Sequence, residues 1–192
     1  MKTCFVVALV ACSSKPAEHA PAPPVTAPRS MALAISTAPS IYELPMQLHD
    51  ADAKSIGLDI DRGKPVLVSM FYSSCTTECP LLISELAHTL AEAARRDARV
   101  LLVSFDPARD TPERLREVAR ERHLDDRWTL AVASEADARA LAAVLGVKYR
   151  RLENGDFAHG ATMVVLDREG RPIARTDTLA DRTGVVAALA AQ

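Results

Sequence analysis

The sequence predicts an α/β fold, with a central mixed sheet that carries helices on both faces. Past Ile41, short apolar runs typical of strands alternate with segments in which apolar residues recur at helical spacing. Turn and helix-capping residues separate these segments, and such an alternation indicates an α/β sheet. With 192 residues, of which 48% are hydrophobic, the chain has material for one domain of roughly 150 residues, which buries about 70% of its unfolded surface.

The first predicted elements lead to a pair of cysteines. Residues 47–60 predict an irregular pair of strands, and the turn Gly63-Lys64-Pro65 precedes an apolar strand at 66–71. Pro80 suits the first helical position because its missing N–H would have no partner there, so we expect a helix to begin directly behind Cys79. Apolar residues on one face support this helix, at Leu82, Leu86, Leu90 and Ala93.

A second strand and helix follow. The strand at 100–105 ends in the segment Asp106-Pro107-Ala108-Arg109-Asp110-Thr111-Pro112. In this segment Thr111 suits an N-cap and Pro112 the first residue of a helix that reaches about His123. The segment therefore has a sufficient structural role as a turn and a cap.

The next strand is predicted at 128–132. Behind it, Ser134 and Asp137 form a capping-box pattern that opens a helix. This helix runs to Leu145 and stops at Gly146, a residue that tolerates the left-handed conformation common at helix ends.

The last predicted elements close the sheet. We expect 148–152 and 161–166 to form a hairpin of the sheet, with the turn Asn154-Gly155 between them. Asp167-Arg168-Glu169-Gly170 predicts a further turn. A final helix is expected over about 182–191.

The N-terminus predicts an export signal followed by a tether. Lys2 precedes a short apolar stretch that is too short to span a bilayer as a helix. Leu9-Val10-Ala11-Cys12 resembles the bacterial lipobox, which implies cleavage before Cys12 and a lipid on that cysteine; the alternative is an ordinary signal peptide cut elsewhere. We expect a signal peptide at 1–11, a Pro/Ala-rich tether at 12–40 and one domain at 41–192, held at the periplasmic face of a bacterial envelope membrane.

Charge and composition restrict the class of partner. The net charge is −2, aromatic residues make up 4% of the chain, and no long basic run occurs. These features argue against a nucleic-acid surface. Metal, small-molecule or protein partners are favoured.

Cys75 and Cys79 lie where the predicted strand gives way to the predicted helix. A thiolate beside the first turn of a helix faces unpaired N–H groups and the positive end of the macrodipole, which lowers the thiol pKa. Such a cysteine acts as a nucleophile or as a metal ligand.

A cysteine pair between a strand and a helix suggests a thioredoxin-like fold. The spacing is Cys-x-x-x-Cys, one residue longer than the thioredoxin motif. In that fold the segment from His159 to Val165 would face the cysteines, with Ala161 where the reductases have a cis-proline. Cys75, Cys79 and His159 would then come together.

Several motifs agree with one protein family in their order along the chain. The strongest is Tyr72-Ser73-Ser74-Cys75-Thr76-Thr77-Glu78-Cys79-Pro80, which matches Cys-x-x-x-Cys-Pro. The others are Asp106-Pro107 with Arg109-Asp110-Thr111-Pro112-Glu113, Trp128-Thr129, Leu145-Gly146-Val147-Lys148-Tyr149-Arg150, and His159 before a strand that ends in Asp167-Arg168-Glu169-Gly170-Arg171. On these residues, the chain from about Tyr42 to Arg175 resembles the Sco/SenC family of thioredoxin-like copper-binding proteins that help to assemble cytochrome c oxidase.

By position, the resemblance implies that Cys75, Cys79 and His159 are copper ligands. It also suggests a role beside the metal loop for the segment from Asp106 to Thr111. It implies a recipient copper protein as partner, a cytochrome c oxidase subunit, and a thiol-reducing partner that keeps the cysteines reduced. The chain departs from the family at Ala158-His159-Gly160, where Asp-His-Ser is frequent, and at its lipobox-like signal, where a transmembrane helix is usual.

The donor set agrees with this implication. Two thiolates and an imidazole are soft ligands that suit Cu(I) and can also bind Cu(II). Three ligands leave an open position for a ligand of the recipient, which suits delivery better than storage. Zinc could occupy the same ligands.

Other interpretations of these residues remain. Cys75 and Cys79 could form a structural disulfide, although its short loop would stabilise the domain little. They could also be the redox pair of a thiol–disulfide oxidoreductase that reduces a partner protein. The longer spacing and the presence of His159 argue against this interpretation. A peroxiredoxin-type peroxidase expects Thr where this chain has Tyr72, and His159 could be only a hydrogen-bonded loop residue.

Overall fold

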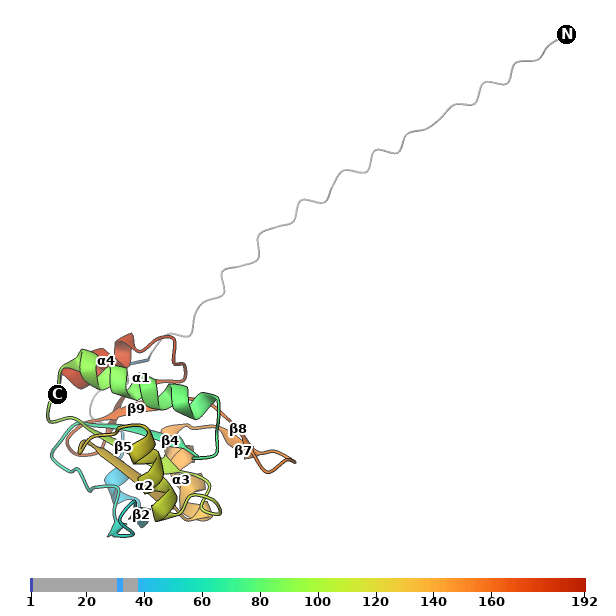
Figure 1. Ribbon diagram of the computed structural model, residues 1–192. Coiled ribbons are helices and arrows are strands. Elements are labelled where there is room, and N and C mark those ends of the chain that lie inside the picture. The colour runs from blue at the N-terminus through green and yellow to red at the C-terminus, as the bar shows by residue number, and fades with distance from the viewer. Residues whose placement is uncertain (2–30, 33–37) are drawn as a thin grey trace.

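The computed structural model describes residue 1, residues 31–32 and the continuous stretch 38–192 (Figure 1). Most of the expected signal peptide and tether, Cys12 included, lies outside the described residues. Two residues of the range expected as tether, Met31–Ala32, form strand β1 at one edge of the main sheet. Within the described ranges, no helix has the length and apolar character that crossing a membrane requires.

The domain is built on a mixed sheet of eight strands in the order β1-β10-β9-β4-β5-β6-β2-β3. Strands β4, β5 and β6 run parallel to one another, and the other neighbouring pairs are antiparallel. Besides β1, the strands are β2 (Leu48–Asp50), β3 (Ser55–Ile56), β4 (Val66–Phe71), β5 (Arg99–Ser104), β6 (Trp128–Ala133), β9 (Met163–Leu166) and β10 (Pro172–Thr176).

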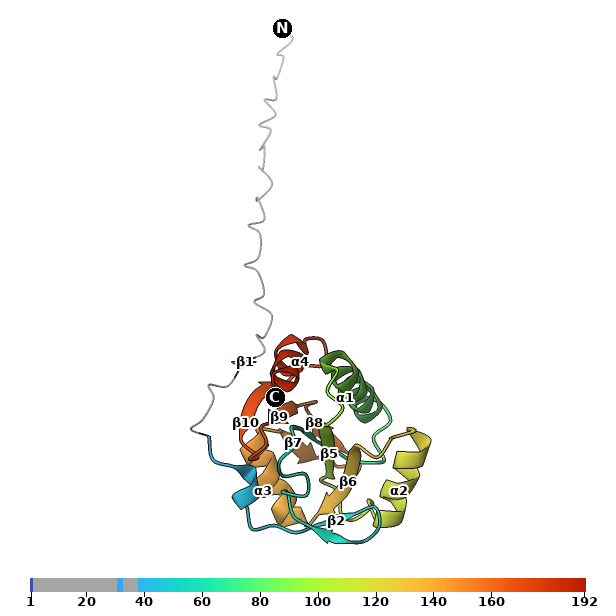
Figure 2. The same ribbon diagram turned by 90° about the vertical axis from the view of Figure 1, so that its left-hand side faces the viewer.

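Helices cover both faces of this sheet. They are the 3-10 helix η1 (Ile41–Glu43) and the α-helices α1 (Glu78–Ala93), α2 (Pro112–Glu121), α3 (Glu135–Leu145) and α4 (Thr183–Ala190). Right-handed crossovers from β4 to β5 and from β5 to β6 place α1 and α2 on one face, where α4 packs against α1. Figure 2 shows α3 on the opposite face. The predicted α/β fold is confirmed.

The core explains the apolar patterns of the sequence. All six residues of β4 are buried, as expected for a strand with helices over both faces. The predicted apolar face of α1 is also buried, at Leu82, Leu86, Leu90 and Ala93. β4 and α1 are thus firmly packed on either side of the cysteine loop.

The predicted helix caps of α2 and α3 are confirmed. The Thr111 hydroxyl accepts the N–H of Arg114, and Pro112 is the first residue of α2. The Ser134 hydroxyl accepts the N–H of Asp137 at the start of α3, and Gly146 ends that helix with a φ of 70°. A left-handed φ of this kind is accessible to glycine without a steric cost.

The predicted start of the first helix is wrong by two residues. Helix α1 begins at Glu78, so Cys79 lies in its first turn and not on the loop with Cys75. Pro80 still falls within the first turn, where its missing N–H costs no helical hydrogen bond.

The predicted hairpin between 148–152 and 161–166 is also wrong. Strand β7 (Tyr149–Arg151) pairs with β8 (Phe157–His159) in a separate two-stranded sheet, through the turn Asn154-Gly155. The apolar strand β9 instead pairs with β4 and β10 inside the main sheet. The reason is burial: all four residues of β9 are buried, whereas both arginines of β7 are exposed.

Candidate metal centre

The first half of the candidate site is the loop between β4 and α1. Cys75 lies half-buried on this loop, and Cys79 is 2% exposed in the first turn of α1. The Cys75 Sγ accepts the N–H of Cys79 at 3.2 Å, whereas the side chain of the N-cap residue Thr77 makes no capping hydrogen bond. The sulfur of Cys75 therefore caps the helix, which accounts for the early start of α1.

The second half is His159 at the end of β8. Its Nε2 lies 3.7 Å from the Cys75 Sγ and 3.6 Å from the Cys79 Sγ. Its Nδ1 lies 3.2 Å from the carbonyl oxygen of Gly160. Because a carbonyl only accepts, the Nδ1 carries a proton in this contact. The Nε2 faces the two sulfurs, where it can donate to a thiolate when it is protonated and can bind a metal when it is not.

These three side chains form a metal-ligand cluster. The two sulfurs and the imidazole nitrogen all lie within 4.8 Å of one another. Bonds of about 2.3 Å to sulfur and about 2.0–2.1 Å to nitrogen, at tetrahedral to trigonal angles, put sulfur and nitrogen roughly 3.6–3.8 Å apart. The observed separations match this range, so the cluster could hold one metal ion without a large rearrangement.

The two thiols differ in acidity. Burial raises the pKa of Cys75, but hydrogen bonds from His159 and from the N–H groups of Cys79 and Thr77 outweigh it and lower the pKa to about 7. Burial raises the pKa of Cys79 well above the usual thiol range, and a charge on Cys75 raises it further. Without a metal, Cys75 is thus the thiolate of the pair at neutral pH.

Asp110 holds the cysteine loop in place. Its carboxylate is 1% exposed and accepts the N–H of Ser73 at 3.0 Å. It also accepts hydrogen bonds from the hydroxyls of Ser73 and Ser104. Since Ser104 ends β5, the carboxylate ties the loop after β4 to the loop after the neighbouring parallel strand.

Arg109 holds the β7–β8 hairpin against the same loop. Its guanidinium donates to the buried carboxylate of Asp106, to the carbonyl of Gly155 at 2.9 Å and to Asp156 at 3.3 Å. It also lies over the rings of Tyr72 and Phe157, with its central carbon 5.6 and 5.8 Å from the ring centroids. One cation therefore links the hairpin that carries His159 to the C-terminal edge of the sheet.

Aromatic rings orient the imidazole. Phe157 and His159 lie two residues apart on β8 and so face the same side. The His159 ring meets the rings of Tyr72 and Phe105 edge to face, with both centroid distances 5.5 Å. A depression of about 430 Å³, lined by parts of 72–78 and 152–159, opens above the cluster, so a ligand from outside has access to it.

The structure brings together the three residues that the sequence singled out, Cys75, Cys79 and His159. Two other histidines lie elsewhere: His49 is on β2, and His88 on α1 pairs with Glu85. Met70 and Met163 are buried in the core.

From their own residues, Arg109 and Asp110 were interpreted as part of a turn and a cap, and only the resemblance to the family suggested a role of their segment beside the metal loop; their individual contacts were missed. The charged residues of that segment could have indicated these positioning roles. An Arg and two Asp follow directly on a buried strand, at the edge of the sheet where the cysteine loop was expected.

Comparisons with known proteins place this geometry in context. The model of the SCO1/SenC family matches residues 36–192. Among curated protein sequences there is no significant match.

Solved structures of Sco proteins share the fold. Arabidopsis thaliana ScoI with copper bound is 19% identical, with a TM-score of 0.67 over 77% of this chain and 94% of that one. A SCO1/SenC family lipoprotein from Bacillus anthracis str. Ames is 21% identical, with a TM-score of 0.68 over 78% and 94%. BsSco, described as a member of the Sco family of cytochrome c oxidase assembly proteins with a disulfide switch, is 19% identical, with a TM-score of 0.64 over 81% and 97%.

Proposed function

Because the chain belongs to the SCO1/SenC family, we propose that it binds copper through Cys75, Cys79 and His159 and delivers it to the copper site of a cytochrome c oxidase. The observation that carries this proposal is the convergence of two thiols and one imidazole nitrogen within 4.8 Å. The copper-bound Sco structure and the oxidase-assembly role named for BsSco support it.

The donor set suits copper as cargo. Two sulfurs and one nitrogen are soft ligands that stabilise Cu(I) and also accept Cu(II), whereas hard cations prefer oxygen. The cluster supplies three ligands and lies below an open depression. A ligand from the recipient can therefore enter before any of the three leaves, which makes transfer by ligand exchange feasible.

The proposal includes the location of the protein. We propose a signal peptide at 1–11, a lipid on Cys12 and a tether at 12–40 that holds the domain at the periplasmic face of the envelope. The lipoprotein from Bacillus anthracis supports this arrangement. The substitution Cys12→Ser should move the protein from the membrane fraction to the soluble fraction while Cu(I) binding is retained. Unchanged membrane fractionation of the variant would contradict a lipid anchor.

Copper titration of the reduced chain tests the metal site. We expect one Cu(I) per chain by competition with a chromophoric chelator. His159→Ala should keep a dithiolate Cu(I) site of lower affinity and lose the Cu(II) absorption of the three-ligand site. His88→Ala is the matched control, because His88 lies on α1 and pairs only with Glu85 in the described structure. Equal spectra of His159→Ala and the parent would remove His159 from the site.

A thiol–disulfide oxidoreductase is the second candidate. The observation in its favour is the contrast between a half-exposed Cys75 with a pKa of about 7 and a buried Cys79, a contrast that suits an attacking and a resolving thiol. Insulin reduction, assayed in parallel, separates the two functions. Dithiol exchange needs only the sulfurs, so a reductase would keep most of its turnover in His159→Ala, whereas a carrier shows no turnover in either form.

A further inference from the structure

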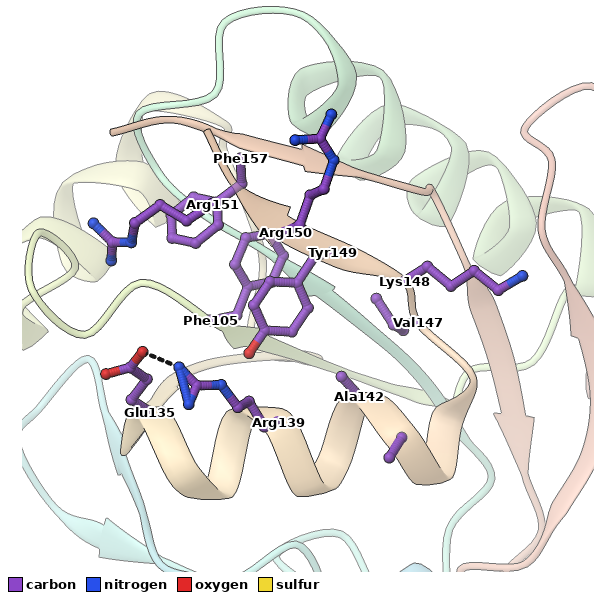
Figure 3. A pocket seen from close by; sticks show the side chains of 11 residues that line it. Phe105, Glu135, Arg139, Ala142, Val147, Lys148, Tyr149, Arg150, Arg151 and Phe157 are labelled. Atoms are coloured by element: carbon purple, nitrogen blue, oxygen red, sulfur yellow. Dashed lines mark hydrogen bonds and ion pairs between the residues drawn. The ribbon is translucent and has the colours of Figure 1, made fainter. Parts of the chain in front are cut away.

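A basic groove lies beside the candidate metal centre, between α3 and β7 (Figure 3). It encloses about 430 Å³. Its aromatic floor contains Phe105 and Tyr149, whose rings stack with centroids 4.5 Å apart. Four cationic side chains line it, and with Tyr149 they define the basic groove: Arg139, Lys148, Arg150 and Arg151.

The groove carries an excess of positive charge on a chain whose net charge is −2. Glu135 is the single carboxylate among the lining residues, and it pairs with Arg139. The guanidinium of Arg151 lies 3.7 Å from the buried carboxylate of Asp106, but that carboxylate already accepts a hydrogen bond from Arg109. Positive charge at the surface is therefore left on the exposed side chains of Lys148, Arg150 and Arg151.

The hydroxyl of Tyr149 adds a directional donor. Its oxygen is buried and has no hydrogen-bond partner within the described part of the chain. Figure 3 shows this hydroxyl pointing across the cavity toward α3 and Arg139. A buried unpaired hydroxyl is unfavourable, so an incoming acceptor such as a carboxylate would satisfy its hydrogen bond.

The basic groove is continuous with the metal site. Lys148, Tyr149 and Arg150 also line a shallower depression together with His159 and Gly160. A protein segment that occupies the basic groove therefore passes directly alongside the imidazole.

We propose that the basic groove docks an acidic segment of the protein that receives the metal. Its carboxylates pair with Lys148, Arg150 and Arg151, and one of them accepts a hydrogen bond from Tyr149. The inference rests on the proposed function, because the partner is the acceptor of the copper. Electrostatic attraction of this kind raises the association rate and orients the partner before ligand exchange begins.

The test uses the full chain and two synthetic acceptor peptides. Each peptide carries a cysteine pair, flanked by glutamates in one and by glutamines in the other. The rate of Cu(I) transfer to each peptide is measured under reducing conditions at low and high salt. Serine versions of both peptides, labelled with a fluorophore, report docking to the metal-free chain by anisotropy, so that docking and metal binding are measured separately.

The decisive variant is Lys148→Glu/Arg150→Glu, and Arg96→Glu/Arg120→Glu is its matched control. Arg96 and Arg120 are exposed residues near the C-terminal ends of α1 and α2, whereas the cysteines lie at the N-terminal end of α1. We expect the groove variant to lose about tenfold or more in affinity and transfer rate for the glutamate peptide at low salt. Its Cu(I) affinity should match the parent, and Tyr149→Phe should weaken docking by a few-fold.

Three results would overturn the docking proposal. The first is an equal loss of affinity and transfer rate in the groove and control variants. The second is equal affinity for the glutamate and glutamine peptides. The third is binding of a single-stranded oligonucleotide to the same residues that is tighter than binding of the glutamate peptide. An unchanged affinity of Tyr149→Phe would remove the hydroxyl from the docking contacts. Absence of Cu(I) binding by the parent chain would instead overturn the proposed function.

Discussion

The two halves of the candidate site are held by different kinds of structure. Cys75 and Cys79 lie at the junction of β4 and α1, a fully buried strand and a helix with a buried face. His159 ends the hairpin β7–β8, which among the described strands has no pairing with the main sheet. Side-chain contacts of Arg109 and aromatic rings hold that hairpin in place.

This difference separates two properties of the site. The sulfur positions depend on the global fold, so disturbing them should also lower the stability of the domain. The imidazole position depends on a local interface, so it can be disturbed while the fold and the dithiolate remain. Since the dithiolate suits Cu(I) and the third ligand supports Cu(II), the hairpin contacts should control the preference for oxidation state.

The largest expected effect comes from the carboxylate that anchors the cysteine loop. Asp110→Ala leaves the N–H and hydroxyl of Ser73 and the hydroxyl of Ser104 without their acceptor. We expect the free energy of unfolding to fall by about 3 kcal/mol, measured by urea denaturation, and Cu(I) affinity to fall with it. Asp156→Ala is the control, since its carboxylate is half-exposed and contacts Arg109 at 3.3 Å. Equal losses in the two variants would contradict the anchoring role.

A smaller and more selective effect is expected from the hairpin contacts. Arg109→Gln alone would leave the buried Asp106 carboxylate short of a partner, so Asp106→Asn/Arg109→Gln removes both charges together. We expect about tenfold weaker Cu(II) binding with an altered absorption spectrum, and a clearly smaller loss of Cu(I) affinity. Competition titrations with both oxidation states measure this. Equal losses of affinity for Cu(I) and Cu(II) would show that the cysteine loop and the hairpin do not act independently.

The smallest effect concerns the pH dependence of the thiols. The pKa of Cys75 is lowered to about 7 and that of Cys79 is raised. The reactive thiolate of Cys75 forms as pH rises through 7, so from pH 7 to 8 its alkylation rate should increase by less than about twofold. Cys79 is protonated throughout this range, so its slower rate should increase about tenfold. Mass spectrometry of each labelled cysteine distinguishes them, and identical pH profiles would contradict the asymmetry.

Local signals explain why much of the fold could be predicted. Thr111, Ser134 and Gly146 cap helices through neighbours a few residues away, and the apolar face of α1 needs only its own spacing. The three candidate ligands emerged from motifs in the sequence and from their resemblance to a known family. Such features do not depend on which distant segment lies nearby.

The wrong hairpin partner and the missed positioning roles depend on distant contacts. The partner of β7 is decided by which strand can enter the buried sheet, and that place belongs to β9. Arg109 meets Gly155 across 46 positions of sequence, and Asp110 meets Ser73 across 37. The start of α1 depends on a sulfur acting as a cap, a role that sequence patterns based on Ser, Thr, Asp and Asn do not include.

The sulfur of Cys75 has two tasks, since it accepts the N–H of Cys79 and faces the imidazole. Electron density that Cys75 donates to a metal, or shares in a bond with another sulfur, is withdrawn from that N–H. The amide proton of Cys79 should therefore report the chemical state of the site by its NMR frequency and its exchange with solvent. One backbone resonance would thus distinguish the free, loaded and oxidised forms of the protein without any added probe.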